Sequence, residues 1–331
     1  MLQPREEIGL LKKKNPSRYK IKPLFPEKMR PISLEERPSK VNWQDFARVY
    51  SGSQEINSFL ETLPDILAAR DFKEFLRHLR GAFRKKKPII FGCGAHVIKV
   101  GLNPVLINLM ENGWISALAL NGAGIIHDFE VALSGKTSED VAAQIKKGDF
   151  GTAAETGELL NEAIQQGKDN NLGLGEAVGR FFSQLELPYK EYSLLYQAYR
   201  LNIPVTVHVS LGTDIIHFHP RVDGAAIGET SLRDFFLFSA LIAQLEGGGV
   251  YLNIGSAVIL PEIFLKAVAY VRNQGFPLKK FITAVFDFKK HYRPLENVVR
   301  RPLGENSQGY YFLGHHEIMI PLLAAALLST K

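Results

Sequence analysis

Glycines, histidines and small polar side chains directly follow a series of short apolar runs in this 331-residue chain. In chain order they are Gly92, Gly94, His96, Asn121, Gly122, Gly124, His127, Asp128, Ser210, Gly212, Asp214, Gly255, Ser256 and Asp287. Glycine lets backbone N–H groups approach a phosphate, and histidines and carboxylates can transfer protons. The pattern indicates a nucleotide or dinucleotide cradle, and tight strand-to-helix turns are the alternative.

The first two of these turns do not complete the dinucleotide-binding fingerprint G-x-G-x-x-G. Val97 and His127 stand where the third glycine of each would belong. Each turn is therefore weak as a motif on its own. The repetition of small residues after several apolar runs is what favours a cradle.

The nine histidines raise the alternative of a metal centre. However, the chain contains no H-E-x-x-H motif and no paired cysteines, so we predict no metal site and expect the histidines to hydrogen-bond to substrate or backbone. The single cysteine, Cys93, lies on a glycine turn, where a thiolate would be stabilised. We nevertheless expect it to be a small buried residue rather than a nucleophile.

The elements that must position these residues are short strands alternating with helices. Apolar runs predict strands at 88–91, 115–120, 204–209, 250–253 and 281–286, and three- and four-residue spacings predict helices at 231–246 and 261–274. Such alternation is typical of an α/β fold with a doubly wound, mostly parallel Rossmann-like sheet and helices on both faces. We expect a single domain over 43–331, with a helical lead-in at 43–87 and inserted helices at about 136–200, broken by a loop at 169–175.

Composition narrows the class of protein further. The chain is 46% hydrophobic and 22% charged, which excludes disorder, collagen and disulfide scaffolds. It has no apolar run of the roughly 20 residues that a bilayer span needs, and no secretory signal pattern. We therefore expect a cytoplasmic protein without a membrane partner.

The net charge of +6 arises entirely from residues 1–40, which carry 11 Lys or Arg against 5 Asp or Glu, whereas the rest of the chain has 29 of each sign. This proline-rich segment predicts an extended arm over 1–42 that lies on its own or a neighbouring subunit. An arm that binds RNA, a membrane or another partner is the alternative. The apolar side chains within the arm favour the first interpretation, so we expect no nucleic-acid partner.

Several of these segments together resemble the deoxyhypusine synthase family, from about residue 88 to the C-terminus. The turn at 121–124 resembles the family's Thr-Ala-Gly-Gly, and 202–205 resembles its His-Ile-Pro-Val strand. The segments at 210–214 and 218–219 resemble its Ser-Leu-Gly-Asp and Phe-His pattern, with Thr213 inserted. The segments 283–287, 293–298 and 320–323 resemble Thr-Ala-x-x-Phe-Asp, Arg-Pro-Asp-Glu-x-Val and Phe-Pro-Leu-Leu.

The resemblance implies a transferase that binds NAD, assembles as a homotetramer and moves an aminobutyl group from spermidine through a lysine imine. It implies that NAD is held by a set of ten residues. They are Gly92, Gly94, Asn121, Gly122, Gly124, Asp128, Gly255, Ser256, Thr283 and Asp287. His96, His127, Asp214, Glu296 and His316 are then the candidate catalytic residues.

The chain departs from the family at the residues that do the chemistry. The family's lysine is replaced by Pro302, its tryptophan by Arg300 and an aspartate by Leu295. Arginine cannot take over imine formation, because its guanidinium group stays protonated. We therefore expect an NAD-dependent enzyme of polyamine-related type with an altered small-molecule substrate, either a polyamine or an anion. The alternatives are a non-catalytic nucleotide-binding relative and a histidine-rich, metal-assisted hydrolase.

Overall fold

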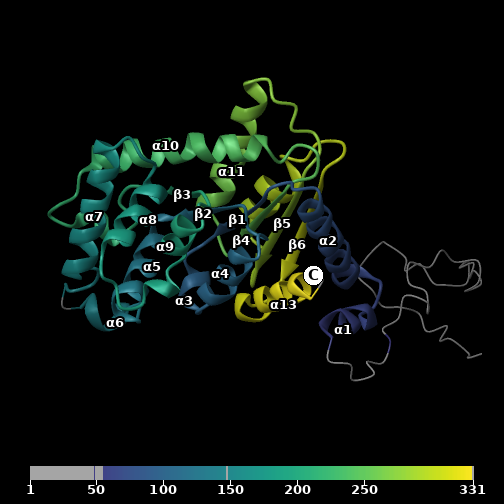
Figure 1. Ribbon diagram of the computed structural model, residues 1–331, viewed down its shortest axis with the longest axis horizontal. Helices are drawn as coiled ribbons and strands as arrows, with labels where there is room; N and C mark the ends of the chain where they lie inside the picture. The colour runs from purple at the N-terminus through teal and green to yellow at the C-terminus, as the bar shows by residue number, and fades with distance from the viewer. Residues whose placement is uncertain (1–47, 49–54, 147, 330–331) are drawn as a thin grey trace, which may run out of the picture. The chain divides into compact units, whose positions relative to one another are not determined.

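A six-stranded, entirely parallel sheet organises the part of the chain that the computed structural model describes, residues 48, 55–146 and 148–329 (Figure 1). The strand order is β3-β2-β1-β4-β5-β6. The strands are β1 Ile89–Cys93, β2 Ala117–Asn121, β3 Val205–His208, β4 Val250–Ile254, β5 Ile282–Asp287 and β6 Gln308–Leu313. The predicted α/β, doubly wound, Rossmann-like fold class is confirmed.

The first five strands coincide with the five predicted runs, because nearly all of their residues are apolar and buried on both faces. The sixth strand was not predicted. It pairs only with β5 and is exposed at both ends, Gln308 and Leu313, so it lacks the continuous apolar run of the inner strands.

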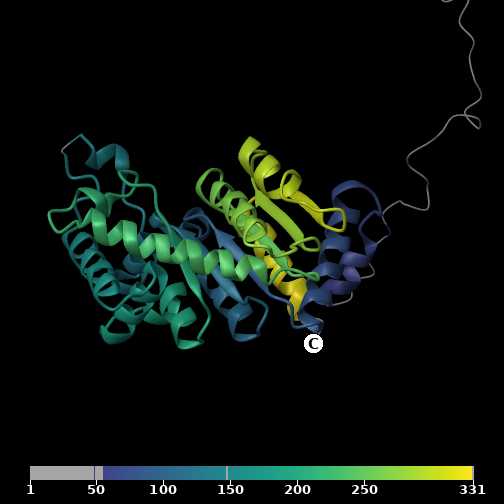
Figure 2. The same cartoon turned by 90° about the horizontal axis from the view of Figure 1, so that it is seen from above.

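Helices cover both faces of the sheet. Tyr251 and Val285 point to one face, where they pack on α10 (Gly224–Ala243), α11 (Ile259–Asn273) and η5 (Leu295–Arg300). The other face packs on α2 (Leu67–Arg84), α4 (Asn103–Glu111), α5 (Gly122–Ser134), α7 (Ala154–Asp169), α8 (Leu174–Gln184), α9 (Leu194–Arg200) and α13 (His316–Leu328). Figure 2 looks from the top of Figure 1, so that α10 faces the viewer.

Shorter elements complete the chain. They are α1 Ile56–Thr62, α3 His96–Lys99, α6 Val141–Gln144, η3 Lys190–Tyr192, η4 Ile215–Phe218 and α12 Tyr292–Pro294. Helix α10 begins seven residues earlier than predicted. The reason is local, since the Asp223 side chain accepts the backbone N–H groups of Ala225 and Ala226 and so caps the helix at that point.

The strand order reverses between β1 and β4. The chain leaves β1 toward β2 and β3, then returns to β4 on the other side, so the segments that follow β1 and β4 diverge at the carboxyl edge. Ligands of open α/β sheets bind at such a reversal. The residues that follow these two strands are therefore the first place to look for a site.

The predicted arm at 1–42 lies outside the described residues. Among the helices of the described part of the chain, none combines the length and apolar character that crossing a membrane requires.

Candidate functional site

Aromatic and imidazole rings gather at the carboxyl edge beside the strand-order reversal. His96, after β1, lies 5.5 Å from His316 and 5.8 Å from Phe288, measured between ring centroids. Phe288 follows β5 and lies 5.9 Å from His316, which begins α13 after β6. Three strand ends thus place these side chains together. His96 is exposed, whereas His316 is fully buried.

His316 has a defined tautomer and one free nitrogen. Its Nε2 lies 3.2 Å from the backbone carbonyl oxygen of Phe286, so Nε2 carries the proton and donates it. Nδ1 is buried and has no hydrogen-bond partner in the structure. Burial lowers the pKa of His316, although the Phe286 carbonyl and the neighbouring Asp287 carboxylate oppose this. The ring is therefore neutral at pH 7 and presents a lone pair at Nδ1.

Asp287 ends β5 beside this ring and is also buried. One of its oxygens, Oδ1, accepts the backbone N–H of Lys289 at 3.2 Å and lies 3.9 Å from Nε2 of His291. The carboxylate thus retains acceptor capacity. A neutral imidazole with a free nitrogen next to a carboxylate can accept a proton from a substrate hydroxyl or amine.

The glycines in β1 and directly after β1 and β4 are required by contacts within the chain. A Cβ atom on Gly94 would lie 2.2 Å from the carbonyl oxygen of Gly255, so the backbones pass too closely for any side chain. The N–H groups of Gly94 and Gly255 donate to the carbonyl oxygens of Ile254 and Phe286. Gly92 similarly lies against the Tyr251 ring. These N–H groups are therefore engaged by the sheet, and the tight-turn alternative accounts for the glycines.

The end of β2 is filled by side chains of the chain itself. The Asn121 side chain accepts the Gly124 N–H at 3.1 Å and caps α5. A Cβ atom on Gly122 would lie 2.0 Å from Oδ2 of Asp214, so this carboxylate lies directly on the start of α5. Burial raises the pKa of Asp214, and His217 opposes the shift. The start of α5 is therefore occupied by an internal anion where we expected a phosphate.

His217, three residues after Asp214, was not among the predicted site residues. Its Nδ1 accepts the backbone N–H groups of Gly212 and Asp214, and its Nε2 lies 3.9 Å from Oδ2 of Asp214. The two side chains form a capping box at the start of the short helix η4. The sequence signal that could have identified this pair is an aspartate at a helix start followed by a histidine three positions later.

Asp128 is a structural residue in this geometry, not the cofactor contact that we expected. It is fully buried and accepts hydrogen bonds from the side chains of Asn103 and Ser193 and from the backbone N–H groups of Leu194 and Leu195. It thereby caps the start of α9. Burial raises its pKa to about 6, against the four hydrogen bonds.

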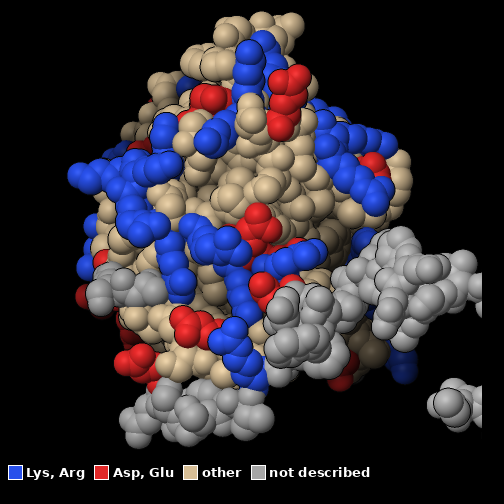
Figure 3. All heavy atoms as spheres, turned by 90° about the vertical axis from the view of Figure 1, so that its right-hand side faces the viewer, with Lys and Arg blue, Asp and Glu red and all other residues tan. Residues whose placement is uncertain are grey.

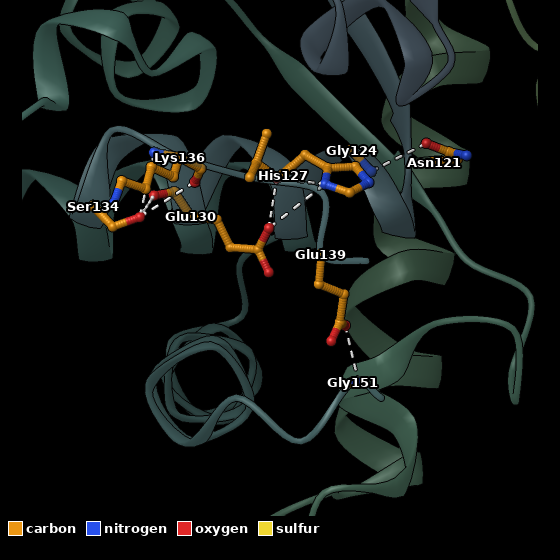
Figure 4. A network of polar contacts seen from close by, with 9 residues as sticks. Asn121, Gly124, His127, Glu130, Ser134, Lys136, Glu139 and Gly151 are labelled. Atoms are coloured by element: carbon orange, nitrogen blue, oxygen red, sulfur yellow. Dashed lines mark hydrogen bonds and ion pairs between the residues drawn. The ribbon is translucent and has the colours of Figure 1, made fainter. Parts of the chain in front are cut away.

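His127 belongs to a separate network on α5, together with Glu130 (Figure 4). The hydroxyl of Thr137 lies 2.6 Å from Nδ1 of His127 and donates to Glu130 at 2.5 Å. Nearby, Glu139 accepts the N–H of Gly151 at 2.9 Å and holds the connection toward α7. The side chain of His127 therefore has a local bonding role.

The remaining predicted residues have identifiable partners. Thr283 donates to the carbonyl of Val298 at 2.8 Å, which joins β5 to η5. The Ser256 hydroxyl oxygen accepts the N–H of Leu260 at 3.2 Å and keeps its own proton to donate. Oε1 of Glu296 lies 2.8 Å from a guanidinium nitrogen of Arg300, one helical turn later. This ion pair neutralises the charge of Glu296.

Cys93 is completely buried, and burial raises the pKa of its thiol to about 12. The thiol is therefore protonated and unreactive at neutral pH, as the small-buried-residue interpretation requires. Within the described residues, no group of three or more His, Cys, Asp or Glu side chains is placed to hold a metal ion.

Sequence reasoning also missed Asp234, a buried carboxylate on α10. It accepts the N–H of Gly175 at 2.9 Å and of Val207 at 2.6 Å, so it caps α8 and covers the free edge of β3. The Ser231 hydroxyl donates to the carbonyl of Val207 and accepts the N–H of Val209, so it also covers this edge. An outward N–H of an edge strand is otherwise open to another strand. No local pattern marks a helix carboxylate with this role.

No family model and no curated protein matches the chain. Among solved structures, it is similar to a protein from Entamoeba histolytica provisionally assigned as a deoxyhypusine synthase, with a TM-score of 0.51 and 13% identity over 83% of this chain and 92% of that one. It is also similar to unliganded AgrE, with a TM-score of 0.50 and 15% identity over 85% of this chain and 34% of that one.

A protein from Methanococcus maripaludis S2, provisionally named LOR/SDH, gives a TM-score of 0.48 at 17% identity, over 84% of this chain and 71% of that one. The chain spans about a third of the length of the AgrE chain and of the arginine dihydrolase ArgZ from cyanobacteria. At these identities, the similarity to the first two structures shows a shared Rossmann-like fold.

Proposed function

We propose that this protein is an NAD-dependent enzyme with a deoxyhypusine-synthase-like fold and an altered small-molecule substrate. The observation that carries the proposal is the free Nδ1 of His316, a buried acceptor without a partner beside the strand-order reversal. A buried polar atom without a partner costs about 1–3 kcal/mol, and a ligand that donates to it would remove this cost.

The residues around β1, β4, β5 and β6 fit a nucleotide better than those around β2. His96, Ser256, Asp287 and His316 all retain a free donor or acceptor at this edge, and they would hold the cofactor. By contrast, the polar groups after β2 are engaged within the chain. NAD, when bound, would supply a hydride acceptor.

The chain's own residues would manage the proton that leaves the substrate. Nδ1 of His316 is the accepting atom, because Nε2 is committed to the Phe286 carbonyl. Asp287 would stabilise the positive charge that then develops on the ring. Phe288 covers His316 on one side and would restrict water there.

The altered substrate follows from the replaced residues. Pro302 stands where the family has its lysine, so no imine can form at this position. Glu296, the carboxylate expected to attract an amine, is neutralised by Arg300. These features favour a substrate with less positive charge than spermidine.

A calorimetric titration with NAD, repeated in the presence of spermidine, tests the proposal. We expect NAD to bind with an affinity that spermidine does not change. An NAD affinity that rises with spermidine, together with release of 1,3-diaminopropane, would instead show that the protein catalyses the family's own reaction. Absence of NAD binding would overturn the proposed function.

The second candidate is a non-catalytic nucleotide-binding relative, for which NAD is not the nucleotide. The observation in its favour is the occupied start of α5, where Asp214 lies on Gly122. The same titration separates the two candidates, because only the enzyme requires NAD.

We further propose that the protein is a homo-oligomer, as the family resemblance implies. Three exposed aromatic side chains support this proposal: Phe236 on α10 at 47%, Tyr270 on α11 at 39% and Phe276, just after α11, at 54% exposure. Light scattering coupled to gel filtration would give the mass in solution, and a mass of one chain would overturn it.

A further inference from the structure

A basic groove lies at the opposite edge of the sheet from the candidate site. It has a volume of about 490 Å³ and lies between the second half of α2, the glycine turn before β4 and the starts of β5 and β6. Its charged lining residues are Arg77, Lys85, Lys280 and Glu305. Figure 3 faces the side on which α2 lies, where Lys and Arg side chains are prominent. The groove therefore carries a surplus of two positive charges.

The three cations of this basic groove are exposed and have no ion-pair partner among the residues that the structure describes. Two further carboxylates lie beside the groove and contact other groups. One oxygen of Glu246 accepts the backbone N–H groups of Lys279 and Lys280. Glu74 lies 3.9 Å from His78. Within the described part of the chain, neither carboxylate forms an ion pair with a cation of the groove.

The walls of the groove are fixed by hydrogen bonds. The N–H groups of Gly247 and Gly248 both donate to the carbonyl of Lys280, and the Ser307 hydroxyl joins Lys279 to Phe281. His78 lines the groove, and its buried Nε2 forms no hydrogen bond but lies 3.9 Å from the Glu74 carboxylate. The walls of the groove are thus fixed by the fold.

The end of α2 explains only part of this charge. Cations near a helix C-terminus offset the negative end of its dipole, and this accounts for Lys85. Arg77 lies two turns earlier, and Lys280 belongs to the segment before β5. These two cations approach the groove from different elements, so the helix dipole does not account for them.

We propose that this basic groove binds a small molecule that carries a phosphate group. A phosphate ester has a charge of about −1.5 to −2 at pH 7, which matches the surplus in the groove. Arginine forms bidentate hydrogen bonds with phosphate oxygens, and a cavity of 490 Å³ is in the range of small-molecule sites. The site is independent of the proposed NAD site, which lies at the other edge of the sheet.

The test is a calorimetric titration of the full chain with inorganic pyrophosphate at about 50 and about 200 mM salt. The variant is R77Q/K280Q, which removes both charges from exposed positions. The matched control is R180Q, a charge removed from an exposed position on α8. Unfolding midpoints of all three proteins establish that they are folded.

We expect the wild type and the control to bind pyrophosphate with similar affinity, weaker at high salt, and the double variant to bind at least about tenfold more weakly. An unchanged affinity in the double variant, or no binding by the folded wild type, would overturn the proposal. Parallel titrations with AMP and with inorganic phosphate identify the source of the phosphate. Tighter binding than inorganic phosphate supports a phosphorylated organic molecule, and equal binding supports recognition of the phosphate alone.

Discussion

Asp128 and Asp287 are both buried carboxylates near the carboxyl edge of the sheet, yet their surroundings differ. Asp128, on the β2 side, accepts four hydrogen bonds from two segments of the chain. Asp287, on the β5 side, accepts one backbone N–H and lies beside His316, whose Nδ1 has no partner. A carboxylate that is saturated by its own chain holds the fold, whereas one with free acceptor capacity can meet a ligand.

The same difference extends to the whole edge. After β2 and β3, Asn121 and Asp214 cover the start of α5, and His127 is bonded to Thr137. After β1, β4, β5 and β6, two histidines and a carboxylate converge with unused hydrogen-bonding capacity. The polar groups of the first half are therefore bonded within the chain, and those of the second half are available to a ligand.

Removing Asp128 should have the largest effect. Asp128→Ala leaves four buried donors without an acceptor, so we expect the free energy of unfolding to fall by about 3 kcal/mol or more. Urea unfolding measures this. The control is Asp140→Ala, which removes an exposed cap of the four-residue helix α6 and should cost at most about 1 kcal/mol. Unchanged stability with lost NAD binding would make Asp128 a ligand contact.

The His316 variant should affect binding more than folding. His316→Leu removes the free Nδ1 acceptor, and we expect NAD affinity to fall at least about tenfold, which corresponds to about 1.4 kcal/mol. Its neighbour His315 has a side chain that is 68% exposed, and His315→Leu should change affinity less than about twofold. Calorimetry of both variants checks this. Equal affinities in the two variants would contradict a role for Nδ1.

The pH dependence of stability tests Asp234, a further buried carboxylate of the structural half. It accepts fewer hydrogen bonds than Asp128, and burial raises its pKa to about 8. The folded protein therefore keeps this proton to a higher pH than the unfolded chain, so stability should fall as pH rises from about 4 to about 8, by up to about 1.4 kcal/mol per pH unit.

Urea unfolding at several pH values measures this slope. Asp234→Asn should flatten it between about pH 6 and about pH 8, above the pKa of Asp128, whereas the exposed Asp169→Asn should leave it as in the wild type. The same slope in the Asp234 variant and the wild type would show that Asp234 does not retain a proton in the folded state.

The smallest effect is expected in the His127 network. Thr137→Val removes the hydroxyl that links His127 and Glu130 at a half-buried position, so stability should fall by about 1 kcal/mol. NAD affinity should stay within about twofold of the wild type. A large loss of NAD affinity with normal stability would show that His127 belongs to the ligand-binding half of the edge.

The strands could be predicted from sequence because a buried parallel strand needs a continuous apolar run, as in Val250–Ile254. The edge strand Gln308–Leu313 could not, because half-exposed residues interrupt its pattern. Position at the carboxyl edge was also predictable for His96 and Asp287, since each follows a predicted strand.

The roles of individual residues were less accessible to sequence reasoning. Asp128 bonds to residues 65 to 67 positions further along the chain, and this distance leaves no local signal. Gly94 has the residue type of a phosphate-binding turn, but its partner is the backbone of Gly255. A glycine that lets a ligand approach and a glycine that lets another strand approach are identical in sequence.

Mapping NAD on the protein by NMR tests the difference between the two halves of the edge most directly. Backbone and histidine-ring resonances would be followed while NAD is added. We expect shifts at His96, Gly255, Ser256 and His316, with Asn121 and Asp128 unchanged. Shifts confined to the residues after β2, or no shifts at saturating NAD, would contradict the assignment of the ligand site to the strand-order reversal.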